Sequence, residues 1–98
     1  MKNLIWFIFA GTRGGETRAR IINILKKRPS NVNQLAANLK LDYKTVQHHL
    51  RILEKHKLVE IANKGGYGAV YFNSSLLEAN MNIFNEIWEK VVKVTYFL

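Results

Sequence analysis

The sequence predicts a mainly α-helical fold with one two-stranded β ribbon. Segments 17–28 and 43–56 place apolar residues at the three- and four-residue spacing of helices that bury one face. Two short runs rich in β-branched and aromatic residues, 58–62 and 69–72, flank a loop with three glycines, as the strands of a hairpin do. With 98 residues and no internal repeat or linker-like stretch, the chain is expected to form a single domain over residues 1–98.

Residues 1–15 comprise an apolar segment and a glycine-rich loop. The run Leu4–Ala10 is far shorter than the roughly 20 residues that a membrane span needs. We expect a helix here, although so short a run also fits a buried strand. Lys2 before this run resembles the start of a signal peptide, but no small-residue cleavage site precedes Gly11. Because the chain has no cysteine that would call for an oxidising compartment, we expect a cytoplasmic protein.

The helix predicted over 17–28 has a clear inner and outer side. Its inward side chains are Ala19, Ile22, Ile24 and Leu25. The basic residues between them are expected in water. Together with Arg13, the side chains of Arg18 and Arg20 would neutralise phosphates, although Arg18 could equally pair with Glu16 or with the terminal helix. Pro29 ends the helix, because the residue before a proline is disfavoured in helical conformation.

Two further helices follow. Asn31 or Asn33 is suited to cap a short one that ends by Lys40. Asp42 is suited to cap the next, over 43–56, because its carboxylate accepts free backbone N–H groups and complements the helix dipole. The buried stripe of this helix consists of Val46, Leu50 and Leu53.

A final helix is predicted toward the end of the chain, starting from Ser74 or Ser75, either of which is suited to cap it. Spacings of three and four join Leu77, Asn80, Phe84, Ile87, Val91, Val94 and Leu98. This repeat is typical of a coiled-coil seam, so we expect a long C-terminal dimerisation helix over 74–98. Asn80, the polar member, either sets the register of pairing or lies at the exposed start of the helix.

The order of these elements defines a core over 16–73: a helix, a helix-turn-helix, and then a β-hairpin. Such an order is that of a winged helix-turn-helix, in which the second helix of the motif enters the DNA major groove. The distribution of charge agrees with a DNA-binding role. The whole chain has a net charge of +8, and residues 1–64 hold 13 basic and 4 acidic side chains. A basic body with a nearly neutral, aromatic-rich tail indicates a nucleic-acid partner and a packing segment.

The segment 41–58 (LDYKTVQHHLRILEKHKL) resembles the recognition-helix signature of ArsR-type winged helix-turn-helix regulators. The matching residues are Thr45, Val46, His49, Leu50 and Leu53. Residues 17–21 (TRARI) resemble the opening of that family's domain, and 33–36 (NQLA) resemble its next helix. The glycine-containing segment 65–71 fits the wing.

The resemblance implies a homodimer that represses transcription by occupying a palindromic operator, with terminal helices at the interface. Metal-sensing members use cysteines early in the helix-turn-helix, or histidines and carboxylates in the terminal helix. Here residues 33–37 contain no thiol and residues 74–98 contain no histidine. We therefore expect no metal site and no cofactor, and the sequence leaves any small-molecule effector open.

Double-stranded DNA is the expected partner of the outer side of helix 43–56 and of the wing. The residues expected to contact it are Tyr43, Lys44, Thr45, Gln47, His48, Arg51, Lys64 and Tyr67. Arginine and lysine suit guanine edges or phosphates, glutamine suits an adenine edge, and tyrosine suits a thymine methyl or a phosphate. The alternative is a solvated polar helix face, with a glycine loop that only closes the hairpin.

The histidines predict no metal pair. His48 and His49 are adjacent, so on a helix their side chains point about 100° apart. By its place in the motif, His49 is expected to be structural, packing or capping something local. His56 is expected to interact favourably with the helix dipole.

The two ends of the chain hold more aromatic residues than a monomer of this size is expected to bury. We expect a dimer interface formed by Trp6, Phe7, Leu77, Phe84, Ile87, Trp88 and Val91. The alternatives are an apolar effector pocket and attachment of the first segment to a membrane surface.

These observations favour a homodimeric, sequence-specific DNA-binding transcription regulator that acts as a repressor. Helix 43–56 would enter the major groove and wing 58–72 would lie on the adjacent backbone. The alternative is a winged helix used as a protein-interaction module without specific DNA binding. An enzyme is not expected, because no carboxylate pair, activated nucleophile or metal cluster stands at a usable spacing.

Overall fold

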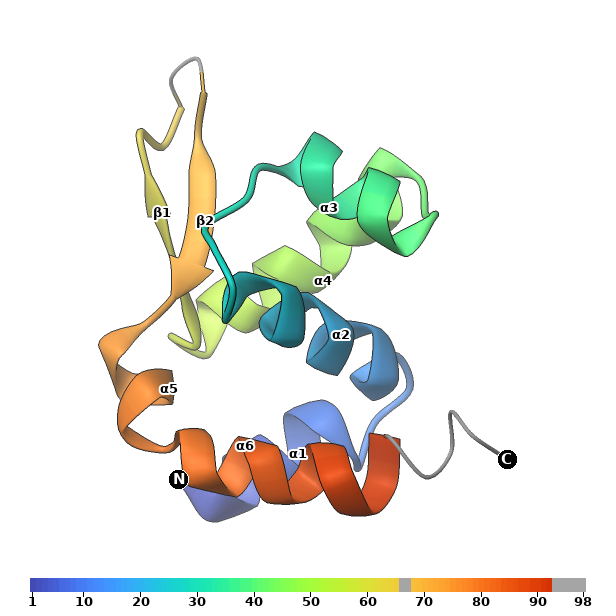
Figure 1. Cartoon of the computed structure of the whole chain (residues 1–98), viewed down its shortest axis with the longest axis vertical. Helices are drawn as coiled ribbons and strands as arrows, with labels where there is room; N and C mark the ends of the chain where they lie inside the picture. The colour runs from blue at the N-terminus through green and yellow to red at the C-terminus, as the bar shows by residue number, and fades with distance from the viewer. Residues whose placement is uncertain (66–67, 93–98) are drawn as a thin grey trace.

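The computed structural model describes residues 1–65 and 68–92, and the side chains of these up to residue 90. It is mainly helical with one antiparallel hairpin, as predicted (Figure 1). In chain order the elements are α1 (Lys2–Phe9), α2 (Gly15–Leu25), α3 (Val32–Leu39), α4 (Tyr43–Lys55), β1 (Val59–Ala62), β2 (Val70–Asn73), α5 (Ser75–Ala79), α6 (Met81–Ile87) and the π-helical turn η1 (Trp88–Val92).

The elements divide between the two ends of the molecule (Figure 1). Helices α1 and α6 pack on each other at one end, and the hairpin extends toward the other. Helix α2 lies between them and contacts α1, α3, α4 and β2. The apolar first segment is therefore a helix, as expected, and the alternative of a buried strand is wrong.

Three helix starts follow the predicted capping chemistry. At α3, Asn31 Oδ1 accepts from the N–H of Gln34, and Gln34 Oε1 accepts from the N–H of Asn31, both at 2.8 Å. At α4, Asp42 Oδ1 accepts from the Thr45 N–H. At α5, the Ser74 hydroxyl accepts from the N–H of Leu77. Each side chain satisfies a backbone donor that the first helical turn leaves unpaired.

The hairpin pairs Val59 with Asn73 and Ala62 with Val70. An isolated bridge adds Ser30 to the other side of β2, through two backbone hydrogen bonds with Tyr71. The segment that follows α2 thus fixes the base of the wing to the helices.

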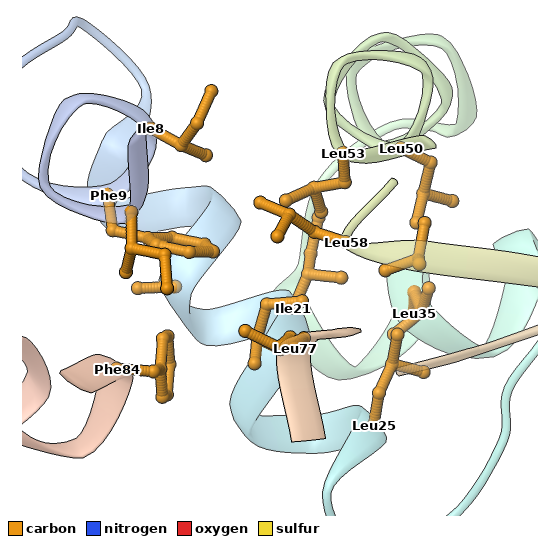
Figure 2. Close-up of a cluster of buried hydrophobic side chains, with 14 of the residues drawn as sticks. Ile8, Phe9, Ile21, Leu25, Leu35, Leu50, Leu53, Leu58, Leu77 and Phe84 are labelled. Carbon is orange, nitrogen blue, oxygen red and sulfur yellow. The ribbon is translucent and has the colours of Figure 1, made fainter. Parts of the chain in front are cut away.

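One apolar core joins the helices and the hairpin (Figure 2). Leu50 and Leu53 of α4 point toward Leu35 of α3 and Leu58 before β1. Its largest buried side chains include Phe9 and Phe84, whose rings meet edge to face with centroids 5.0 Å apart. This aromatic pair joins α1 to α6.

The predicted continuous helix over 74–98 is wrong within the described residues. Asn80 ends α5 with a φ of −117° and a ψ of 20°, and its Nδ2 donates to the carbonyl of Leu76. Asparagine favours such local bonds over a helix interior, because its side chain competes with the backbone for hydrogen bonds. The chain turns at Asn80, and α6 then packs against α1 instead of extending α5. Residues 93–98 lie outside the described part of the chain.

The expectation that Arg18 stays in water is also wrong. Its side chain is buried, with 3% relative exposure, and it faces the loop after α1. Arg18 lies four residues before Ile22 and seven before Leu25, so it occupies the buried stripe of α2.

The close approach of α1 and α2 requires a glycine at position 15. A Cβ atom there would lie 2.6 Å from the carbonyl oxygen of Phe9, a backbone atom that no side-chain movement relieves. We expect Gly15→Ala to lower the free energy of unfolding by about 1–3 kcal/mol, the usual cost of overpacking. Urea denaturation followed by circular dichroism measures it. Gly11→Ala is the control, because its Cβ would lie 3.3 Å from the nearest atom. Equal losses in the two variants would contradict the backbone clash.

Candidate nucleic-acid interface

Helix α4 has one buried and one exposed side. Val46, Leu50 and Leu53 have no exposed surface. On the other side, the exposed residues of the predicted DNA-contacting set are Tyr43, Lys44, His48 and Arg51, and the half-buried ones are Thr45 and Gln47. Tyr43 keeps 47% of its surface in solvent, which is high for a large aromatic residue.

A groove of about 490 Å³ lies between the start of α4, the start of α3 and strand β2. Tyr43 and Gln47 line it from α4, Asn31 and Asn33 from the start of α3, and Tyr71 from β2. The structure therefore places Tyr43 and Gln47 of the predicted set beside Asn33 and Tyr71, which the sequence did not assign to the site. From the sequence, Asn33 is expected only as a cap and Tyr71 only as a strand residue.

Burial raises the pKa of the half-buried Tyr71, and the carboxylate of Glu54 raises it further. The phenol therefore stays neutral at physiological pH and keeps its hydrogen-bond donor. Together with the amides of Asn33 and Gln47, it gives the groove both donors and acceptors, which are the groups needed to recognise a polar edge.

At the wing, Lys64 lies beside α4. Its Nζ forms a 3.0 Å ion pair with Glu54, and both side chains are substantially exposed. Exposed pairs of this kind contribute little stability, so the lysine remains available for another anion. Tyr67, also expected to contact DNA, lies outside the described residues.

His48 and His49 point to different surroundings. His48 is exposed, whereas His49 is buried and its Nδ1 lies 3.2 Å from Nη1 of Arg18. The predicted structural role of His49 is thus confirmed by its contact. In the described part of the chain, no group of three His, Cys, Asp or Glu side chains is arranged to hold a metal ion.

The residues expected at a dimer interface differ in how much of their surface is exposed. Leu77, Phe84 and Ile87 are completely buried in the core of one chain, so they have no surface to offer a partner. This corrects the expectation that one chain could not bury them. Phe7 is 55% exposed, Trp6 and Trp88 are half-buried, and the side chain of Val91 is outside the described part.

The helix-turn-helix α3–α4, followed by the β1–β2 hairpin, defines a winged helix-turn-helix. Residues 15–60 match the family model described as "Bacterial regulatory protein, arsR family". The resemblance found in the sequence is thus confirmed over residues 15–60, and the match supports a DNA-binding transcription regulator. No curated protein matches the chain. None of the helices within the described residues is both long enough and apolar enough to cross a bilayer.

The start of α4 depends on Asp42. The Thr45 N–H donates to its Oδ1 at 2.7 Å. Hydrogen bonding from Thr45, by its side chain first and by this N–H second, lowers the pKa of the Asp42 carboxyl. A lowered folded-state pKa means that the stabilisation is present above the unfolded value of about 3.9 and is lost as the pH falls through the folded value.

We expect Asp42→Ala to lower the midpoint of urea unfolding at neutral pH. The variant should also lack the loss of stability that protonation of Asp42 causes in acid. Asp42→Asn is the matched control, because asparagine also caps helices but does not titrate. Asp42→Asn should have a urea midpoint close to that of the wild type but lack the acid dependence. Circular dichroism measures the unfolding, and an unchanged midpoint in Asp42→Ala would contradict the role of the cap.

Proposed function

We propose that the protein is a homodimeric, sequence-specific DNA-binding repressor of transcription. Helix α4, within the predicted 43–56 segment, enters the major groove, and the wing over 58–72 lies on the adjacent backbone. The observation that supports this most directly is the exposed polar side of α4, which presents Lys44 and Arg51 opposite a completely buried stripe. A helix held in this way offers side chains to a groove without losing its own packing.

The residues of this face suit different parts of a duplex. Arg51 and Lys44 suit guanine O6 and N7 or phosphates, and Gln47 suits the N6 and N7 of adenine. Tyr43 suits a thymine methyl group. Lys64 suits the backbone beside the wing, once it exchanges Glu54 for a phosphate.

The opposite end of the molecule suits a two-fold contact. Phe7 is exposed on α1, beside the half-buried Trp6 and near α6, which packs on α1. Since α1 and α6 lie at the far end from the hairpin, a dimer formed there leaves both α4 helices accessible (Figure 1). Two such helices read half-sites about one helical turn apart, roughly 34 Å, in a palindromic operator.

DNA binding is expected to depend strongly on salt. If a dimer neutralises about eight phosphates, log K should fall with log salt concentration at a slope near −7. Duplexes selected from random DNA, titrated by fluorescence anisotropy, provide the measurement. Arg51→Ala and Gln47→Ala should each cost about 1–3 kcal/mol of binding or change the preferred base at one position.

Lys90→Ala is the control for this series, because it removes an equal charge from η1. Its affinity and sequence preference should match those of the wild type. If no duplex is selected and the protein instead binds a protein partner through α4, the alternative of an interaction module replaces this proposal.

The dimer is expected to depend on Phe7. Phe7→Glu places a charge in an apolar contact and should shift the protein to monomers, because an unpaired buried charge is costly. Sedimentation velocity over a range of concentrations measures the shift. Leu76→Glu is the matched control, because Leu76 is also an exposed apolar residue but lies on α5 beside the wing. Dimers that persist in Phe7→Glu would exclude this surface.

A further inference from the structure

Arg18 is a buried cation that the DNA-binding face does not use. Its guanidinium donates to three oxygens near the end of α1: Nε to the carbonyl of Ile8 at 3.1 Å, and Nη2 to the Thr12 hydroxyl at 2.6 Å and to the carbonyl of Arg13 at 3.2 Å. None of the ion pairs within the described residues includes Arg18. Burial lowers the pKa of this guanidinium, which nevertheless stays charged.

The fourth partner of Arg18 is on the helix that faces DNA. Nη1 of Arg18 lies 3.2 Å from Nδ1 of His49, which is 8% exposed. Arginine only donates, so Nδ1 must accept, and the imidazole is neutral with its proton on Nε2. Protonated His49 would have no lone pair at Nδ1, and it would place a second positive charge against Arg18.

The loop after α1 closes tightly over this contact. A Cβ atom on Gly14 would lie 2.7 Å from Cε1 of His49 and 3.0 Å from Nη1 of Arg18. Gly14 also has a φ of +84°, a conformation that side chains rarely allow. The loop backbone at Gly14 therefore lies directly against both side chains of the pair.

We propose that Arg18 is a positioning residue for the DNA-reading helix. Through His49 it fixes α4 against the loop that joins α1 to α2, and uptake of a proton at Nδ1 of His49 releases that contact. The inference rests on the proposed DNA-binding function, because it describes how the same face is held in its reading position.

The charged groups around His49 favour its neutral form. Burial lowers the pKa of His49 most, followed by the positive charge of Arg18 and then by His48. Besides Arg18, α2 carries Glu16 and Arg20, which form an ion pair with each other, and the loop before it carries Arg13. Of the other elements packed on α4, α3 carries no titratable side chain, and β1 carries only Glu60, which is exposed. Nothing among these groups compensates a charge on His49.

The sign of the pH dependence follows from this lowered pKa. The unfolded chain takes up the proton first, near the ordinary histidine pKa of about 6.5. The contribution of the pair to stability is therefore complete above that pH and is lost as the pH falls toward the folded pKa of His49. If α4 is fixed by the same contact, its reading position is lost only when the folded protein itself takes up the proton, around the folded pKa of His49.

The test follows the intact protein from about pH 8 to about pH 4 by NMR. We expect the His49 imidazole to titrate below about 6.5. The amides of Thr12 and Gly14 in the loop and of residues 43–45 at the start of α4 should shift with the same midpoint. If the amides of the loop and of the start of α4 do not shift as His49 titrates, the proposal is overturned. This measurement needs neither DNA nor a variant.

His49→Asn is the informative variant, because asparagine places a non-titrating acceptor at the position of Nδ1. It should remove the shared midpoint from the loop and α4 amides. His48→Asn is the matched control and should retain it. A pH dependence in His49→Asn equal to that of the wild type would also overturn the proposal.

DNA binding gives a separate readout. For a duplex selected from random DNA, wild-type affinity should fall about tenfold for each pKa unit by which DNA lowers the pKa of His49. His49→Asn should lack this component and His48→Asn should keep it. If no duplex is bound at any pH, the proposed function fails, whereas the amide titration still decides the role of Arg18.

Discussion

The architecture depends on the burial of one stripe of α4. Val46, Leu50 and Leu53 are removed completely from solvent, and each such side chain contributes about 1.5–3 kcal/mol. The side chains of a helix stand at fixed angles around its axis, so burial of one side also determines which residues point outward. The polar face of Tyr43, Lys44, Gln47 and Arg51 is a geometric consequence of that packing. The core thus presents the surface that we propose reads DNA, without any loop having to fold on the ligand.

The residues proposed to contact DNA and the exposed apolar Phe7 lie on different elements. Lys44 and Arg51 are on α4 and Lys64 follows β1, whereas Phe7 lies on α1 at the end away from the hairpin. A cationic surface attracts a duplex over a range that shortens as the salt concentration rises. An exposed apolar surface favours contact between copies of the chain. The dimer that we propose through Phe7 would therefore leave α4 accessible to DNA.

The sequence alone predicted much of this site, and its errors have physical causes. The stripe of α4, the caps at Asn31, Asp42 and Ser74, and the hairpin all depend on local chemistry, so they could be read from neighbouring residues. Arg18 was misassigned because charge was weighed above position. Its spacing from Ile22 and Leu25 places it on the buried stripe, and that spacing was the available signal. The partners that make its burial tolerable come from α1 and α4, which no local pattern reveals.

The C-terminal segment shows the same division. Spacings of seven and three between Leu77, Phe84 and Ile87 indicated an apolar face, and all three residues are buried. Whether it met a second copy or its own chain was decided by the turn at Asn80, which directs α6 onto α1. By itself the sequence determined the helices up to α4, the hairpin, the caps, the outward face of α4 and the ArsR-type resemblance, because these depend on contacts within a few residues. Only the tertiary structure decided which apolar faces stay inside one chain and which side chains meet across the core, because those contacts join residues tens of positions apart.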